Sequence, residues 1–222
     1  MSTEIIILLG VLAGIFQILG YVLYIKNTDI DPNPVTWFMF AYGTGILCLL
    51  EWDSSATWPE LFLPVTCSFF SIYVSYRCWK KARARDSSRW WPEDWWPEDK
   101  WERLSFISDI GITLGYIAAW VLVTFSILTT EYKDIAVILF LLLSNLSVFP
   151  SFYPLVRETY LEPSKEAPVP WIVWTIAYTL LAIVTYETHH SFFHILMFYP
   201  LINILLHGIV AWISSKKVRT FA

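Results

Sequence analysis

Long apolar runs separated by short polar segments divide the chain into seven candidate membrane helices. A bilayer core of about 30 Å needs about 20 apolar helical residues. No run alternates polar and apolar positions in the way that a barrel strand does. The predicted helices cover residues 5–25, 35–51, 58–79, 104–129, 135–156, 169–186 and 192–213. The expected fold class is therefore an all-α membrane protein.

Composition agrees with a lipid environment. Hydrophobic residues make up 56% of the chain and charged residues 15%, whereas soluble domains have about 45–50% and about 25%. The 13 tryptophans fit rings that sit at membrane–water interfaces.

The run that starts at Ile5 has no basic residue before it, so it lacks the n-region of a signal peptide. The three cysteines have no metal-binding spacing.

The placement of basic residues predicts the orientation. With seven spans, 14 of the 15 basic residues fall in one set of loops and termini, and only Lys133 falls in the other set. Because cytoplasmic loops carry the excess of Lys and Arg, we expect the N-terminus outside and the C-terminus in the cytoplasm.

An internal repeat relates the first three predicted helices to the last three. At a fixed offset of 136, residues 32–81 and 168–217 share 11 identities, which include Tyr42 with Tyr178, Glu51 with Glu187 and Pro64 with Pro200. One connector helix between two three-helix copies gives both copies the same direction across the membrane, as in parallel repeats. The expected units are a first repeat at 1–81, a cytoplasmic Trp-rich loop at 82–103, a connector helix at 104–130 and a second repeat with its tail at 131–222.

Two segments carry a resemblance to a known family. They are Gly20-Tyr21-Val22-Leu23-Tyr24-Ile25 and Pro32-Asn33-Pro34-Val35-Thr36-Trp37. Together with the three-one-three order of helices, they resemble the SWEET and PQ-loop superfamily, and in particular uncharacterised bacterial members, although the Pro-Gln pair is absent. The resemblance implies a SWEET-like fold and a substrate held by an asparagine of the last helix, here Asn203.

Polar groups inside predicted spans are candidates for substrate binding because they are costly in hydrocarbon. Asn203 and His207 share a helix face, and His207 could titrate near neutrality and couple transport to protons. Each of these residues could instead form a hydrogen bond that holds helices together. The substrate-binding candidates are Asn203, Asn145, Tyr42, Tyr178, His207, Trp174 and Gln17.

Prolines inside predicted helices are candidate hinges. They are Pro150, Pro154, Pro64 and Pro200, and the last two should kink their helices at equivalent depth.

Asp109 is expected in the first turns of its helix, where the helix dipole favours an acid, with a functional carboxylate as the alternative. His189, His190 and His194 do not have diagnostic metal spacing, so we expect solvated side chains at the membrane edge.

The pattern favours a small-solute transporter that works by alternating access between the two three-helix units. The alternative is a non-transporting receptor, sorting protein or scaffold of the same architecture. We expect no enzymatic activity, no cofactor, no metal and no nucleic acid. The expected partners are the lipid bilayer and a small-molecule solute, and assembly into a homo-oligomer stays open.

Overall fold

The computed structural model describes residues 1–27, 34–85, 97, 99–164 and 166–216. The described part of the chain is all-helical and contains no strand. A 3-10 turn, Ile195–Met197, precedes the last helix. The helices are α1 (Thr3–Asn27), α2 (Pro34–Asp53), α3 (Trp58–Arg85), α4 (Lys100–Thr124), α5 (Thr130–Leu161), α6 (Pro168–His189) and α7 (Phe198–Ser215).

The polarity of the surface and of the interior identifies an integral, multi-pass membrane protein. Seven helices in the described residues are long and apolar enough to cross a bilayer. Large apolar side chains such as Phe69, Leu114 and Trp212 are exposed on the outside. Polar side chains such as Gln17 and Asn203 are buried between the helices. A lipid environment favours this distribution. Apolar side chains gain nothing from burial there, whereas polar groups exposed to lipid are costly.

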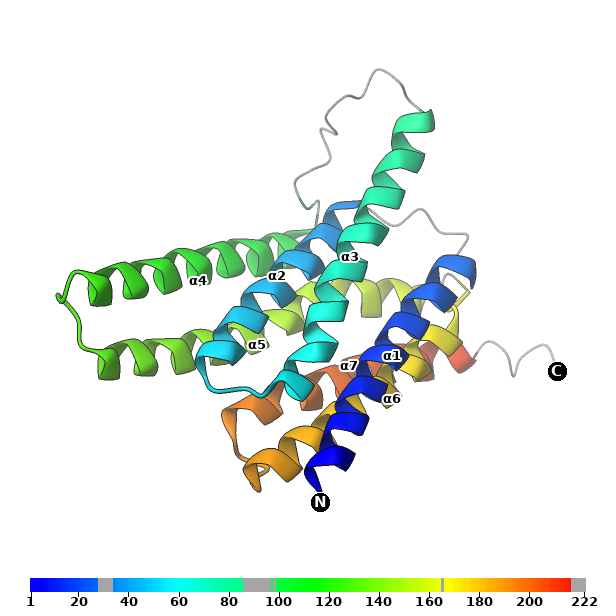
Figure 1. Ribbon diagram of the computed structural model, residues 1–222. Coiled ribbons are helices and arrows are strands. Elements are labelled where there is room, and N and C mark those ends of the chain that lie inside the picture. The colour runs from blue at the N-terminus through cyan, green and yellow to red at the C-terminus, as the bar shows by residue number, and fades with distance from the viewer. Residues whose placement is uncertain (28–33, 86–96, 98, 165, 217–222) are drawn as a thin grey trace.

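The helices pack in a defined set of pairs. α1 lies against α3 and α6, and α2 lies against α3 and α5. α7 lies against α5 and α6, whereas α4 packs on α5 and on α2 at one edge of the bundle (Figure 1). The close approach of α1 to α6 requires Gly20, because a Cβ atom there would lie 2.2 Å from Nε1 of Trp174. A larger residue at this position would push the two helices apart.

Local caps decide where the helices begin. α4 begins at Lys100, before the predicted residue 104, because Asp99 caps it by accepting a hydrogen bond from the Trp101 backbone N–H (2.7 Å). Asp109 is therefore more than two turns inside α4. The expectation that it lies in the first turns of the helix is wrong.

The candidate hinges do not share one environment. Pro64 lies inside α3, and Pro150 and Pro154 lie inside α5. Pro200 lies in the first turn of α7, because that helix begins at Phe198 rather than at the predicted residue 192. A proline is tolerated in a first turn, so Pro200 and Pro64 do not occupy equivalent places in their helices, and a kink at Pro64 stays a prediction. A hinge role for the prolines of α3 and α5 stays a prediction.

Two expectations fall outside the described residues. The Trp-rich loop was expected at 82–103, and most of it (86–96 and 98) is not described. The segment from Pro32 to Trp37 that carries the family resemblance begins with two residues, Pro32 and Asn33, that are also not described. The helices on either side of the loop leave it shorter than expected, since α3 continues to Arg85 and α4 starts at Lys100.

Candidate functional site

A cavity of about 60 Å³ lies at the centre of the bundle. A buried water needs about 10–15 Å³, so the cavity has room for a few water molecules. Among the described residues, α1, α2, α3, α5, α6 and α7 contribute to its wall, and α4 does not. Its lining residues are Gln17, Tyr21, Trp37, Phe40, Thr44, Cys67, Val148, Phe152, Trp171, Trp174, Tyr178, Tyr199, Asn203 and His207.

The polar groups of this central cavity come mainly from α1 and α7. Asn203 donates from Nδ2 to the Tyr199 carbonyl (2.9 Å). Nδ1 of His207 lies 2.8 Å from the Asn203 carbonyl. A carbonyl only accepts, so Nδ1 carries the hydrogen and Nε2 of the neutral ring is an acceptor. Oε1 of Gln17 is buried and has no hydrogen-bond partner among the described residues. The cavity therefore offers unused acceptors to a polar ligand.

Aromatic rings surround His207. The ring centroids of Tyr178, Phe152, Trp171 and Trp174 lie 4.9, 5.1, 5.4 and 5.7 Å from that of the imidazole. Such rings present flat apolar faces. Tyr178 adds a polar hydroxyl at its ring edge, which lies 3.1 Å from the hydroxyl of Tyr199. This combination suits a ligand with both an apolar face and hydrogen-bonding groups.

One end of the bundle holds the C-terminal ends of α1, α3, α5 and α7, and we call it the C-terminal end. There, aromatic rings beside the cavity pack against one another: the Tyr24 centroid lies 5.1 Å from that of Trp37 and 6.2 Å from that of Trp171. We call these three residues, with Phe152, the aromatic closure. Behind it, Glu166 accepts a hydrogen bond from Nε1 of Trp171 (2.9 Å). Burial raises the pKa of Glu166 to about 7.

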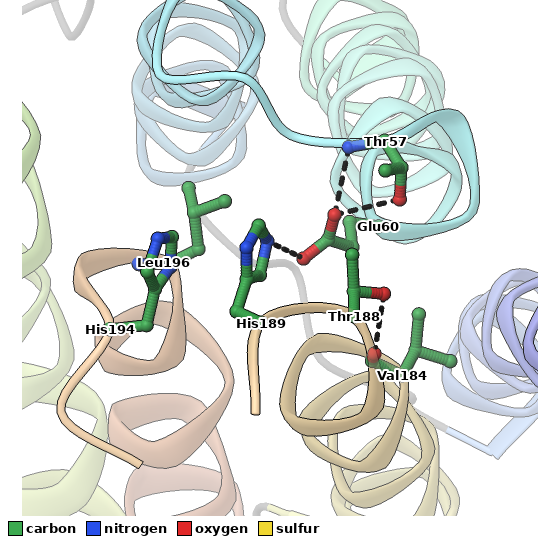
Figure 2. A network of polar contacts seen from close by, with 7 residues as sticks. All are labelled: Thr57, Glu60, Val184, Thr188, His189, His194 and Leu196. Carbon is green, nitrogen blue, oxygen red and sulfur yellow. Dashed lines mark hydrogen bonds and ion pairs between the residues drawn. The ribbon is translucent and has the colours of Figure 1, made fainter. Parts of the chain in front are cut away.

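At the opposite end, which we call the N-terminal end, charged and polar groups link the helices. Figure 2 shows Glu60 between Thr57 and His189: one carboxylate oxygen lies 3.0 Å from Nε2 of His189, and the other accepts from the Thr57 backbone N–H and hydroxyl (2.8 and 2.7 Å). The rings of His189 and His194 stack with their centroids 3.8 Å apart. Burial, followed by the neighbouring His189, lowers the pKa of His194.

An ion pair between a lysine and an aspartate lies at the same end of the bundle. Nζ of Lys133 on α5 lies 2.8 Å from the Asp53 carboxylate on α2, and 4.3 Å from the ring centre of Trp120. The Glu60–His189 pair joins α3 to α6, and the Lys133–Asp53 pair joins α5 to α2. Both pairs thus connect one of the first three helices to one of the last three. We call the two pairs the polar closure.

The structure brings together five of the seven predicted binding residues. Asn203, Tyr178, His207, Trp174 and Gln17 all line the central cavity.

The two remaining candidates lie outside this lining. Tyr42 faces α4, where its hydroxyl donates to Oγ1 of Thr113 (2.6 Å). Asn145 is buried, and its Nδ2 donates to the Leu141 carbonyl (2.9 Å). Oδ1 of Asn145 has no partner among the described residues.

Sequence reasoning missed the acidic groups at both ends. Glu60 had a usable signal, because Thr57-Trp58-Pro59-Glu60 fits the capping-box pattern of a Ser or Thr followed three residues later by Glu. Glu166 had none, since an acidic residue in a polar loop gives no local indication of burial. His189 and His194 were expected as solvated side chains, but His189 has a buried carboxylate as its partner.

These features define an integral membrane protein whose described residues form seven membrane-spanning helices around a small, mostly apolar cavity that carries a few buried polar groups. Comparison of the chain with protein-family models, with curated proteins and with solved structures finds no match.

Proposed function

We propose that this protein is a small-solute transporter of SWEET-like architecture that works by alternating access. The packing pairs support two equivalent units. The contacts of α1 and α2 with α3 have counterparts in those of α5 and α6 with α7. The contact of α1 with α6 has its counterpart in that of α2 with α5. The helix α4 connects the units, as expected for parallel three-helix repeats.

The observation that carries the proposal is the position of the central cavity between these units. Cys67 and Asn203 are separated by the repeat offset of 136, and both line it. Ligand sites in transporters with internal repeats lie near the midplane, at the interface between the repeats. The solute would bind there through Asn203, His207 and Gln17, with its apolar face against the indole of Trp174.

Alternating access follows from the two closures. Opening the polar closure connects the cavity to one side of the membrane, and opening the aromatic closure connects it to the other. In the orientation that the basic residues favour, the polar closure faces outside. A cavity of about 60 Å³ describes a state closed at both ends, so solute entry requires the units to move apart.

A ligand screen tests the binding site. Purified protein is heated in the presence of sugars, nucleosides, vitamins and amino acids, and a ligand of the folded state raises the apparent melting temperature. We expect the shift to be lost in Asn203→Ala and kept in Asn145→Ala, which also removes a buried asparagine but outside the cavity. An equal shift in both variants would place the ligand elsewhere.

The small volume of the cavity favours one alternative, a receptor or scaffold of the same architecture that moves no solute. Uptake of the identified ligand into proteoliposomes separates the two. Uptake that Asn203→Ala abolishes supports transport. Binding without uptake supports a receptor.

A further inference from the structure

An open groove of about 490 Å³ runs between α4 and α5 on the outside of the bundle. Ligand sites usually have volumes of about 300–1,000 Å³. Along α4 the groove extends from Leu104 to Ile112, which is about 12 Å of helix and less than half of the bilayer core. α4 begins at the C-terminal end of the bundle, where Trp101 contacts Tyr153 of α5. The groove therefore lies in the leaflet at that end.

The wall of the groove is mainly apolar. Leu104, Leu143 and Leu146 line it with side chains that are about half exposed. The two serines of the wall have already used their hydroxyl hydrogens. Ser108 donates to the Leu104 carbonyl (2.8 Å), and Ser147 donates to a carboxylate inside the bundle (2.8 Å). The groove therefore suits a hydrocarbon chain better than a polar solute.

Gly111 keeps the middle of the groove open. A Cβ atom built on Gly111 would have no atom within 4 Å, so no neighbouring side chain requires glycine there. Gly115, one turn further along α4, differs, because a Cβ atom there would lie 2.6 Å from the Phe140 ring. Glycine weakens a helix interior relative to alanine. Close packing of α4 on α5 explains Gly115, whereas only the open groove gives Gly111 a role.

Two cationic side chains lie just beyond the groove at the C-terminal end. Lys100 is one turn before Leu104 on α4, and Arg157 is two turns after Pro150 on α5. Each cation therefore shares its helix face with a residue of the groove. Both are exposed, and within the described part of the chain neither side chain forms an ion pair or a hydrogen bond. Both are thus available to an anionic group.

An aromatic pair lies between the groove and these cations. The rings of Trp101 and Tyr153 have their centroids 5.5 Å apart, and both side chains are partly exposed. Nζ of Lys100 lies 5.3 Å from the centre of the Trp101 ring. Tryptophan and tyrosine favour the level of the lipid head groups. The order of apolar groove, aromatic pair and cations matches the order of acyl chain, glycerol region and phosphate in a phospholipid.

We propose that the groove between α4 and α5 binds an acyl chain of one anionic phospholipid, whose phosphate contacts Lys100 and Arg157. Basic pockets between membrane helices bind anionic head groups on the cytoplasmic side, and the orientation that the basic residues favour places this end there. A second copy of the chain is a poorer occupant, because copies in the same orientation would bring like charges together. Lipid binding here does not depend on the proposed transport.

Native mass spectrometry tests the head-group contacts. The purified protein is incubated with phosphatidylglycerol, which is anionic, or with phosphatidylcholine, which is not, and the lipid retained per chain is counted. We expect one retained phosphatidylglycerol, bound at least about tenfold more tightly than phosphatidylcholine. Replacing Lys100→Gln and Arg157→Gln together should remove this preference. Lys26→Gln is the matched control, because Lys26 is a basic residue in the last turn of α1 that does not line the groove.

A second pair of variants tests the acyl-chain site. Gly111→Phe places a ring in the groove, where a Cβ atom meets no neighbour, and should abolish the retention of phosphatidylglycerol. Gly208→Phe is the matched control. A Cβ atom on Gly208 also has no atom within 4 Å, but this residue lies on α7, outside the groove, so the variant should retain the lipid.

The proposal is overturned if the unaltered protein retains both lipids equally or retains neither. It is also overturned if Gly111→Phe and Gly208→Phe retain the same amount of phosphatidylglycerol. A dimer that Gly111→Phe dissociates while the lipid stays bound would contradict it too, since a second copy would then occupy the groove. If Gly111→Phe does not fold, the comparison of the double variant with Lys26→Gln decides.

Discussion

The two ends of the helix bundle are held together by different physical means. At the N-terminal end, the Glu60–His189 contact and the Lys133–Asp53 ion pair join the helices. At the C-terminal end, the aromatic closure packs rings from α1, α2, α5 and α6. Ion pairs near water contribute about 0–1 kcal/mol each, whereas a buried tryptophan contributes several times that. The comparison therefore predicts that the N-terminal end opens more readily.

The largest effect is expected at the aromatic closure. Trp171→Ala removes a ring that is 3% exposed and contacts Tyr24, Phe152, Trp174 and His207. We expect a loss of about 3–5 kcal/mol in the free energy of unfolding, measured by denaturant or thermal unfolding in detergent. Trp212→Ala is the control, because Trp212 is 62% exposed on the lipid-facing surface. A similar loss in both variants would contradict the assigned role of Trp171.

An intermediate effect is expected at Glu166 and depends on pH. The pKa of its carboxyl is about 7 in the folded protein and about 4.3 in an unfolded chain. The folded state binds more protons between these values, so stability falls as pH rises from about 4.5 to 7. Glu166→Gln still accepts from Trp171 but does not ionise. It should remove this pH dependence and be more stable at pH 8, by on the order of 2 kcal/mol. A variant with unchanged pH dependence would show that Glu166 does not titrate in this range.

The smallest effect on stability is expected at His189. His189→Asn removes the contact with Glu60, while Glu60 keeps its hydrogen bonds to Thr57. We expect a loss of about 1 kcal/mol in the free energy of unfolding, the usual contribution of one hydrogen bond. His190→Asn is the matched control, since His190 is exposed and has a φ of 53°, which Asn tolerates. A loss of several kcal/mol in His189→Asn would instead show that the two closures contribute equally to stability.

The sequence predicts the helices well because length and apolarity are local properties. All seven predicted helices are present, and the errors lie at their ends. α4 starts earlier because of the Asp99 cap, and α7 starts later because residues 195–197 form a 3-10 turn. Caps of this kind depend on single side-chain hydrogen bonds, which hydrophobic periodicity does not encode.

The site is predicted only in part because repeat-related residues have different neighbours. Tyr178 lines the cavity, but its repeat partner Tyr42 packs against α4, and α4 has no counterpart on the other unit. Asn203 and His207 were identified because one helix face carries both. The acidic groups Glu60 and Glu166 were missed because their burial depends on contacts with other helices.

Cys67 provides the most direct test of alternating access, because its sulfur is buried and lines the central cavity. With Cys48 and Cys78 replaced by alanine, a charged thiol reagent is added to either side of sealed vesicles, and labelling of Cys67 is timed. The account predicts labelling from both sides. His189→Asn should speed it only from the N-terminal end, and Trp171→Ala only from the C-terminal end. Labelling from one side alone, or equal acceleration from both sides in either variant, would contradict two separate closures around a central site.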